Sequence, residues 1–87
     1  MLLEAGMLVQ SRAGHDKGRF FAVIAVNENF ALIADGKEHR LQSPKKKNPK
    51  HLAILTERAD LANITDGGLR KLLHKYNYPN ETNKSEE

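Results

Sequence analysis

Residues 6–26, GMLVQSRAGHDKGRFFAVIAV, consist of two apolar segments on either side of a polar loop that contains two glycines. The second segment, 19–26, is rich in aromatic and β-branched side chains, a composition that favours a β-strand. The first, 7–12, alternates loosely between apolar and polar side chains and also predicts a strand. The stretch therefore predicts two strands joined by the loop 11–19.

Both faces of the strand 19–26 are apolar. Alternate residues form two sets, Phe21, Val23 and Ala25 on one face and Phe20, Ala22, Ile24 and Val26 on the other. Such a strand is either covered on both sides or bends sharply round a small barrel.

Three further strands are predicted at 30–34, 38–42 and 51–55. Asparagines within 27–29 and Asp-Gly at 35–36 supply turns between strands. Pro44 and Pro49 remove two backbone donors, so the segment 43–50, SPKKKNPK, is predicted to be a stiff basic loop. Five short strands joined mostly by tight turns predict a mainly β fold, a small barrel whose closure removes exposed strand edges.

The pattern becomes helical after residue 56. Four apolar side chains recur on one helix face, at Leu69, Leu72, Leu73 and Tyr76. Thr65 or Asp66 can cap the start of this helix, and its apolar face either packs on the barrel or binds a partner helix. Segment 57–64 stays open between a short helix and an irregular link. We therefore divide the chain into a barrel (1–56), a helical extension (57–76) and a polar tail (77–87) that is expected to be disordered.

The composition indicates one small domain. The 87 residues contain no cysteine, which excludes disulfides and thiolate zinc sites. The N-terminus carries Glu4 and no basic segment, so no signal peptide is predicted. The longest apolar run, 20–26, is too short to span a bilayer. We expect a soluble, cytoplasmic protein with no membrane partner.

Positive charge is concentrated in the first part of the chain. Residues 1–51 contain nine Lys or Arg and five Asp or Glu, whereas residues 52–87 contain five and six. Six of the basic residues fall between Lys37 and Lys50, where Glu38 is the one acid. Such a local field favours a polyanionic partner, although a solvated lysine-rich loop has the same composition.

The loop 11–19 has the residues of a turn that contacts phosphate. Gly14 and Gly18 permit positive φ and close approach of a partner. Asp16 is expected to accept hydrogen bonds from the loop's own amides as an Asx-turn, which displays Lys17 at the tip. Backbone N–H groups together with Lys and Arg contact phosphate and sugar oxygens in nucleic acids. The alternative is a surface turn whose charges merely maintain solubility.

Residues 6–26 also resemble a KOW motif, the RNA-associated element of SH3-like barrels in ribosomal proteins and transcription elongation factors. The matching positions are Gly6, Val9, Ser11, Gly14, Asp16, Lys17, Gly18, Arg19 and Val23. The commonest KOW motifs carry a further glycine where this sequence has Phe21, and the apolar strand is similar to the KOW branch of archaeal and eukaryotic large-subunit ribosomal proteins. Residues 27–52 are similar to the segment of that branch in which a hairpin ends in Asp-Gly and a Pro-Lys-rich loop leads into Lys-His-Leu.

This resemblance implies RNA contact by the loop 11–19 and by the basic loop 43–51, which we expect side by side at one end of the barrel. The implied contact residues are Arg12, Gly14, His15, Lys17, Gly18, Arg19, Arg40, Lys45, Lys46, Lys47, Lys50 and His51. We expect that changing Lys45, Lys46 and Lys47 together to glutamate weakens RNA binding and leaves the thermal midpoint almost unchanged.

The expected partner is RNA, most concretely ribosomal RNA, with ribosomal proteins as a second class, and the free protein is expected to be a monomer. The alternative function is an SH3-like interaction module that binds a ribosomal or transcription-machinery protein.

The sequence offers neither a base-stacking platform nor a catalytic constellation. Phe20, Phe21 and Phe30 lie in apolar strands and are expected in the core, which favours recognition of structured RNA through its backbone and 2′-hydroxyl groups. The four histidines have no metal-ligand spacing and no nucleophile beside an oriented base. We therefore expect no enzymatic activity, no cofactor and no bound metal.

Overall fold

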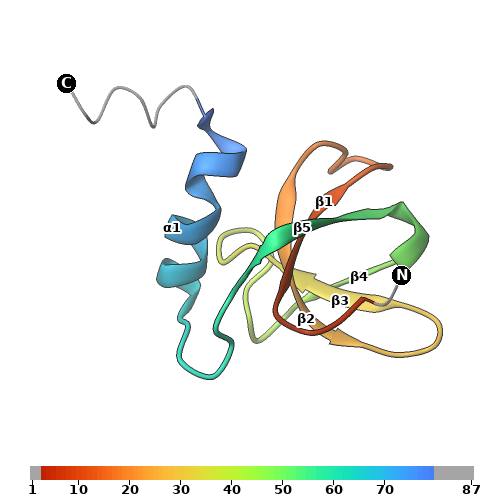
Figure 1. Ribbon diagram of the computed structural model, residues 1–87, viewed down its shortest axis with the longest axis horizontal. Helices are drawn as coiled ribbons and strands as arrows, with labels where there is room; N and C mark the ends of the chain where they lie inside the picture. The colour runs from red at the N-terminus through yellow and green to blue at the C-terminus, as the bar shows by residue number, and fades with distance from the viewer. Residues whose placement is uncertain (1–2, 80–87) are drawn as a thin grey trace.

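Five antiparallel strands form one curled sheet with a helix against one side (Figure 1). The structure is a computed structural model and describes residues 3–79. Its elements are β1 Met7–Ser11, β2 Phe20–Val26, β3 Ala31–Ala34, β4 Lys45–Lys47, a 3₁₀ turn Pro49–His51, β5 Leu52–Arg58 and α1 Asp66–Asn77. The predicted mainly β fold with a C-terminal helix is confirmed.

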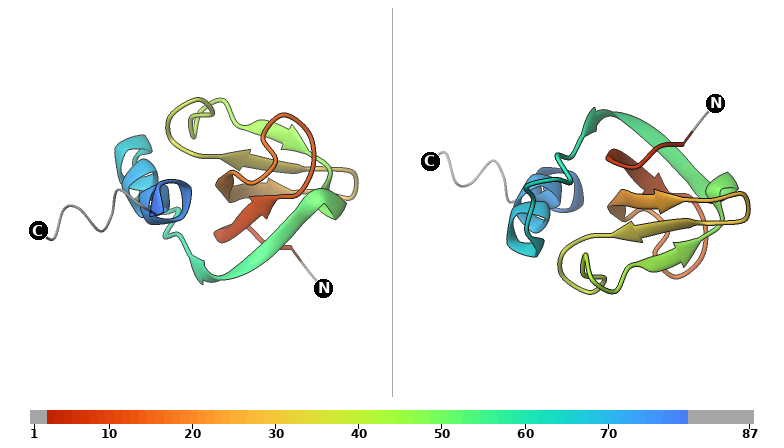
Figure 2. Two further views of the ribbon diagram at one scale, coloured as in Figure 1. Left: turned by 90° about the horizontal axis from the view of Figure 1, so that it is seen from above. Right: turned by 90° about the horizontal axis from the view of Figure 1, so that it is seen from below.

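The curvature of the sheet has a local cause. The strand order is β4-β3-β2-β1-β5, and the register shifts between Val23 and Ala25 in the β2–β3 pair and between Met7 and Val9 in the β1–β5 pair. Such irregularities increase strand twist and bend a sheet. The sheet therefore curls, and the 3₁₀ turn carries the chain from one edge strand to the other (Figure 2). Within the described residues no backbone ladder joins β4 to β5.

Apolar side chains are buried on both faces of the sheet, as the pattern of strand 19–26 predicts. One buried cluster comprises Val9, Phe21, Val23, Ala31 and Ile33, and the other combines Leu8, Ala22 and Ala34 with Leu69 and Leu73 of the helix. Adjacent residues of β2 thus enter opposite clusters, which is the period-two alternation of a strand covered on both sides. The coverage stops at the end of β2, where Ala25 and Val26 are exposed.

The leucine face of α1 packs on the sheet, which settles the choice between self-packing and a partner helix. Leu69 is 0% exposed and Leu73 is 1% exposed. The ring centre of Tyr76 lies 5.1 Å from that of Phe20. The side chain of Asn77 accepts a hydrogen bond from the N–H of Phe20 at 2.9 Å and donates to its carbonyl at 3.4 Å. Side-chain packing and the two hydrogen bonds between Asn77 and the backbone of Phe20 therefore fix the helix along β2.

The bounds of β5 and α1 differ from the prediction, whereas the cap of the helix agrees with it. Thr65 caps α1 as predicted, because its hydroxyl accepts a hydrogen bond from the N–H of Gly68 at 3.0 Å. β5 continues to Arg58 and takes the first part of segment 57–64, and the rest of that segment is irregular or turn. The helix extends to residue 77, and from residue 80 the tail predicted to be disordered lies outside the described residues.

No helix in the described part of the chain combines the length and apolar character needed to cross a membrane.

The predicted fourth strand at 38–42 is wrong, since β4 lies instead within the segment predicted to be a loop. Carboxylates bind the backbone N–H groups that a strand would need for its ladder. Asp35 Oδ1 accepts hydrogen bonds from the N–H groups of Lys37 and His39 at 2.9 and 3.0 Å, and Asp66 Oδ1 accepts one from the N–H of Leu41 at 2.7 Å. Amides bonded to side chains are lost to a sheet ladder. The chain therefore leaves the sheet after β3, passes beside the helix and returns only at Lys45.

We predict that Gly36→Ala destabilises the fold strongly. Gly36 has a φ of +81°, and an added Cβ would overlap the carbonyl oxygen of Asp66 in the first turn of α1. Backbone strain and overlap together should lower the free energy of unfolding by about 3 kcal/mol, which urea denaturation measures.

Gly18→Ala is the matched control. Gly18 has a φ of +90°, and an added Cβ would meet no atom within 4 Å, so only the backbone strain is introduced. This variant should lose about 1 kcal/mol. Equal losses in the two variants would contradict the close approach of Gly36 to the helix.

Candidate nucleic-acid interface

The loop 11–19 is closed at its base by backbone hydrogen bonds. The N–H of Ser11 donates to the carbonyl of Arg19 at 2.9 Å, and the N–H of Gly18 donates to the carbonyl of Ser11 at 2.8 Å. Gly14 and Gly18 have φ values of +87° and +90°, the conformation for which the sequence predicts glycine. The loop is therefore a closed turn that extends the β1–β2 hairpin.

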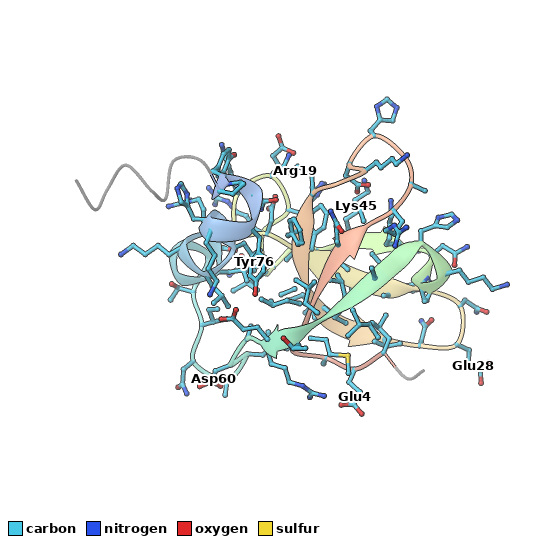
Figure 3. All side chains as sticks on the ribbon, turned by 45° about the horizontal axis from the view of Figure 1, so that its top comes forward. Glu4, Arg19, Glu28, Lys45, Asp60 and Tyr76 are labelled. Atoms are coloured by element: carbon cyan, nitrogen blue, oxygen red, sulfur yellow. The ribbon has the colours of Figure 1, made fainter. Side chains whose placement is uncertain are left out.

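Inside this loop, the carboxylate of Asp16 accepts hydrogen bonds from three side chains. Ser11 Oγ donates to Oδ1 at 2.7 Å, Lys47 Nζ to the same oxygen at 2.8 Å, and Lys45 Nζ to Oδ2 at 2.8 Å. Asp16 is 9% exposed and the side chain of Lys47 is 10% exposed, so this ion pair is largely removed from water. Lys47 also donates to the carbonyl of Ala13 at 2.7 Å. We call Asp16, Ser11, Lys45 and Lys47 the Asp16 clamp; Figure 3 shows Lys45 below the loop.

The clamp holds Asp16 in its charged form. Burial alone acts to raise the pKa of Asp16, but hydrogen bonds from Lys45, Lys47 and Ser11 and the charge of Lys45 outweigh it and hold this pKa well below its ordinary value. A carboxylate whose pKa falls on folding stabilises the native state above its unfolded pKa. That stabilisation is lost as the pH falls through the folded pKa.

Lys45 and Lys47, which the sequence predicts to contact RNA, therefore belong to the Asp16 clamp. Lys45, Lys46 and Lys47 form β4, whose alternate side chains point to opposite sides. Lys45 and Lys47 bind Asp16, whereas Lys46 lies over the ring of Phe30, 4.8 Å from its centre. Changing all three lysines to glutamate would break the clamp and lower the thermal midpoint, contrary to the expectation from the sequence.

Asp16 does order the loop, but through different partners from those expected. Within the described residues its carboxylate accepts from the hydroxyl and two ammonium groups of the clamp, and no loop amide donates to it. The predicted Asx-turn is therefore wrong. Because both lysines come from β4, the loop is fixed by a contact with a distant segment.

The remaining Arg, Lys and His residues near the loop are exposed: Arg12, His15, Lys17, Lys50 and His51. The N–H of Arg12 donates to the carbonyl of His51 at 2.7 Å, so the 3₁₀ turn lies against the base of the loop. The two basic segments are thus neighbours, as predicted. Within residues 3–79 no carboxylate forms an ion pair with Arg12, Lys17 or Lys50.

Arg19 and Arg40 lie in different surroundings. Arg19 is 3.3 Å from the buried carboxylate of Asp35 and 3.9 Å from that of Glu38, and its side chain is 36% exposed. It is therefore partly neutralised but still reaches solvent. Arg40 is exposed on the segment between β3 and β4, and no contact among the described residues joins its side chain to the loop 11–19.

Three exposed acidic side chains lie away from the loop. In Figure 3, Glu4, Glu28 and Asp60 lie along the edge of the molecule opposite the loop, whereas Arg19 and Lys45 lie near its base. An anion that approaches the loop end therefore meets mainly positive charge, and such a field raises the rate at which polyanions associate.

The aromatic side chains divide between core and surface. Phe21 is buried, and Phe20 packs on Tyr76, as predicted. Phe30 is half-buried beneath Lys46 and belongs to neither buried cluster, so its prediction as a core residue is wrong. Tyr78 is 37% exposed.

A second positively charged site is missing from the sequence-based prediction. It is a cleft of about 570 Å³ lined by Lys37, Arg70, Lys71, His74 and Tyr78, which we call the helix cleft. Arg70, Lys71 and His74 lie on the side of α1 away from the buried leucines, and Tyr78 follows the end of the helix, a spacing that the sequence contains. The position of Lys37 opposite them depends on how the helix docks, and no local pattern reveals that.

No protein-family model matches the sequence, and no curated protein is significantly similar to it. The KOW resemblance of residues 6–26 and 27–52 therefore remains a prediction.

We predict that Lys47→Gln destabilises the protein far more than Lys46→Gln does. Lys47 donates to Asp16 and Ala13 from a nearly buried position, whereas Lys46 is exposed and its ammonium group lies over the ring of Phe30. The expected losses are about 2 kcal/mol for Lys47 and roughly 0.5 kcal/mol for Lys46. Thermal or urea unfolding measures both, and similar losses would mean that Lys47 does not occupy the clamp.

We also predict a pH-dependent effect of Asp16→Asn. At pH 7 the change should cost about 3 kcal/mol, because Lys47 loses its counter-charge in a nearly buried position. Below about pH 4 the wild type loses the contribution of its charged carboxylate, so the difference between the two proteins should shrink. Urea denaturation across this pH range measures the difference, with Asp60→Asn, a change at an exposed turn, as the control. A difference that stays constant down to about pH 2 would rule out the low pKa of Asp16.

Proposed function

We propose that this protein binds structured RNA through the loop 11–19 and the adjoining 3₁₀ turn. The observation that carries this proposal is the combination of order and charge at the loop. The Asp16 clamp holds the loop in one shape, while Arg12, Lys17 and Lys50 remain exposed without a carboxylate partner in the described chain. A preorganised cationic surface loses little conformational freedom on binding, and its charges release counterions from phosphates.

The residues of the interface have different roles in this proposal. Arg12, Lys17 and Lys50 contact phosphates, and the imidazole groups of His15 and His51 offer further hydrogen-bond donors. Lys45 and Lys47 are positioning residues, because they act through Asp16. The amide of Gly18 is bonded to Ser11, so Gly18 contributes the shape of the loop and not a donor.

Ribosomal RNA is the proposed target, because the resemblance to KOW proteins of the large subunit covers the loop itself. A folded RNA also suits the interface better than a single strand does, since no exposed aromatic ring lies beside the clamp. A ribosomal target would place the protein in the cytoplasm, where ribosomes are, and we propose that it binds as a monomer.

An interaction module for a protein partner is less well supported. The feature that suggested it was the leucine face of the helix, and Leu69 and Leu73 are buried against the sheet. A catalytic role has no support either. The serine hydroxyl beside the loop is that of Ser11, which is 1% exposed and bonded to Asp16, so it cannot reach a substrate. We therefore propose a binding function without catalysis or a cofactor.

We predict that Lys17→Gln together with Lys50→Gln weakens binding of a fluorescein-labelled RNA hairpin about tenfold at low salt. Each lysine that contacts a phosphate contributes about one unit to the slope of log affinity against log salt, so the slope should fall by about two. Fluorescence anisotropy between about 50 mM and about 200 mM salt measures both quantities.

The matched control is Arg58→Gln together with Lys75→Gln, which changes the net charge equally at two exposed positions remote from the loop. Its salt slope should equal that of the wild type. If both double variants lose the same affinity, the attraction is a property of net charge and the loop is not the binding site.

A further inference from the structure

We propose that the helix cleft binds a single-stranded segment that continues from the structured RNA bound at the loop 11–19. This inference rests on the proposed function but concerns a different surface. The cleft lies between α1 and the turn that follows β3, and its volume of about 570 Å³ is within the range of pockets that hold small ligands. A nucleotide is a ligand of that size.

The lining of the helix cleft is chemically suited to phosphate. Lys37, Arg70 and Lys71 contribute three permanent cations, and no Asp or Glu among residues 3–79 lines the cleft. Arg70 is held at the cleft by a long contact from its Nη1 to the carbonyl of Gly36, 3.5 Å away, which leaves its other donors for a ligand. Guanidinium and ammonium groups on two facing elements can bind a phosphate from both sides.

The same cleft contains an aromatic surface. Tyr78 is 37% exposed, and its ring centre lies 5.1 Å from that of His74. The N–H of Tyr78 donates to the carbonyl of His74 at 2.7 Å, which fixes the backbone from which the ring projects. An exposed ring beside cations is the arrangement with which proteins bind single-stranded nucleic acid, since the base stacks on the ring and the phosphate binds the cations.

The position of the cleft relative to the loop supports a continuous RNA path. Arg19, at the end of the loop 11–19, is 3.3 Å from Asp35, and Lys37 lies two residues further along the same turn and lines the cleft. Partly exposed Arg19 therefore lies between the two sites. A strand that leaves a duplex at the loop would contact Arg19, which also lies 3.9 Å from Glu38, before it reaches Lys37.

Nucleic acid fits this cleft better than the other anionic partners do. A phosphopeptide would use the cations but has no general need of an aromatic ring beside them. A membrane surface would require an apolar face on α1 next to the cations, and that face is buried in the sheet.

The experiment compares two fluorescein-labelled RNA hairpins, one blunt and one with a single-stranded uridine extension. The wild type should bind the extended hairpin about tenfold more tightly, because stacking of one base and one phosphate contact are added. Tyr78→Ala, and separately Arg70→Gln with Lys71→Gln, should abolish this advantage and leave binding of the blunt hairpin unchanged.

Three controls accompany the variants. Tyr78→Phe keeps the ring and should keep the advantage, Tyr76→Phe alters a tyrosine packed on the sheet and should also keep it, and Arg58→Gln with Lys75→Gln matches the charge of the cleft variant. Circular dichroism checks that each variant is folded.

The outcomes separate this inference from the proposed function. Equal affinity of the wild type for the two hairpins, or an advantage that survives in both cleft variants, overturns the inference while binding of the blunt hairpin upholds the loop as an RNA site. If the wild type does not bind the blunt hairpin, the loop proposal is overturned. A phosphoserine peptide that displaces the extension better than a uridine oligonucleotide does would assign the cleft to a protein partner and overturn the inference.

Discussion

The interaction on which the rest of the structure depends is the bonding of one carboxylate, that of Asp16, to two ammonium groups from β4. A buried or nearly buried charge is tolerated only where its partners satisfy it, and here Lys45, Lys47 and Ser11 do so at 2.7–2.8 Å. The contact joins a loop between the first two strands to an edge strand almost thirty residues later in the chain, as the sequence separations of 29 and 31 residues show. It thereby orders the loop and secures the three-residue edge strand β4, which is too short to hold its place by ladder bonds alone.

This arrangement divides the positive charge of the protein into two groups with different tasks. The lysines that face the loop are ion-paired with Asp16 and give the site its shape. The cations that face solvent, among them Arg12, Lys17 and Lys50, give it an attraction for polyanions. A similar division exists at the helix, where the leucines hold α1 on the sheet and the residues on its other side line a cationic cleft with an aromatic ring. In both places, apolar or paired groups set the geometry, and exposed groups are left to bind.

The sequence predicts the parts of this structure that local pattern determines. β1, β2, β3 and α1 follow from period-two and helical spacing of apolar residues, and the positive φ of the two loop glycines follows from their place in a tight turn. The failures all involve distant partners. Residues 38–42 have the composition of a strand, but Asp35 and Asp66 accept hydrogen bonds from the backbone amides of His39 and Leu41. The three lysines of β4 have the composition of a solvated loop, but two of them bind Asp16. The spacing of Arg70, His74 and Tyr78 predicts one wall of the helix cleft. Its other wall, at Lys37, could not be predicted because it depends on how the helix docks on the sheet.

The most direct test of the clamp is an NMR titration of the Asp16 side-chain carboxyl carbon. We expect a midpoint well below the value of about 3.9 that is ordinary for aspartate, with the ammonium signals of Lys45 and Lys47 shifting over the same pH range. Replacing Lys47 by methionine should move this midpoint upward. An ordinary midpoint in the wild type, unaffected by that replacement, would show that Asp16 is an unpaired surface carboxylate and that the loop has no internal anchor.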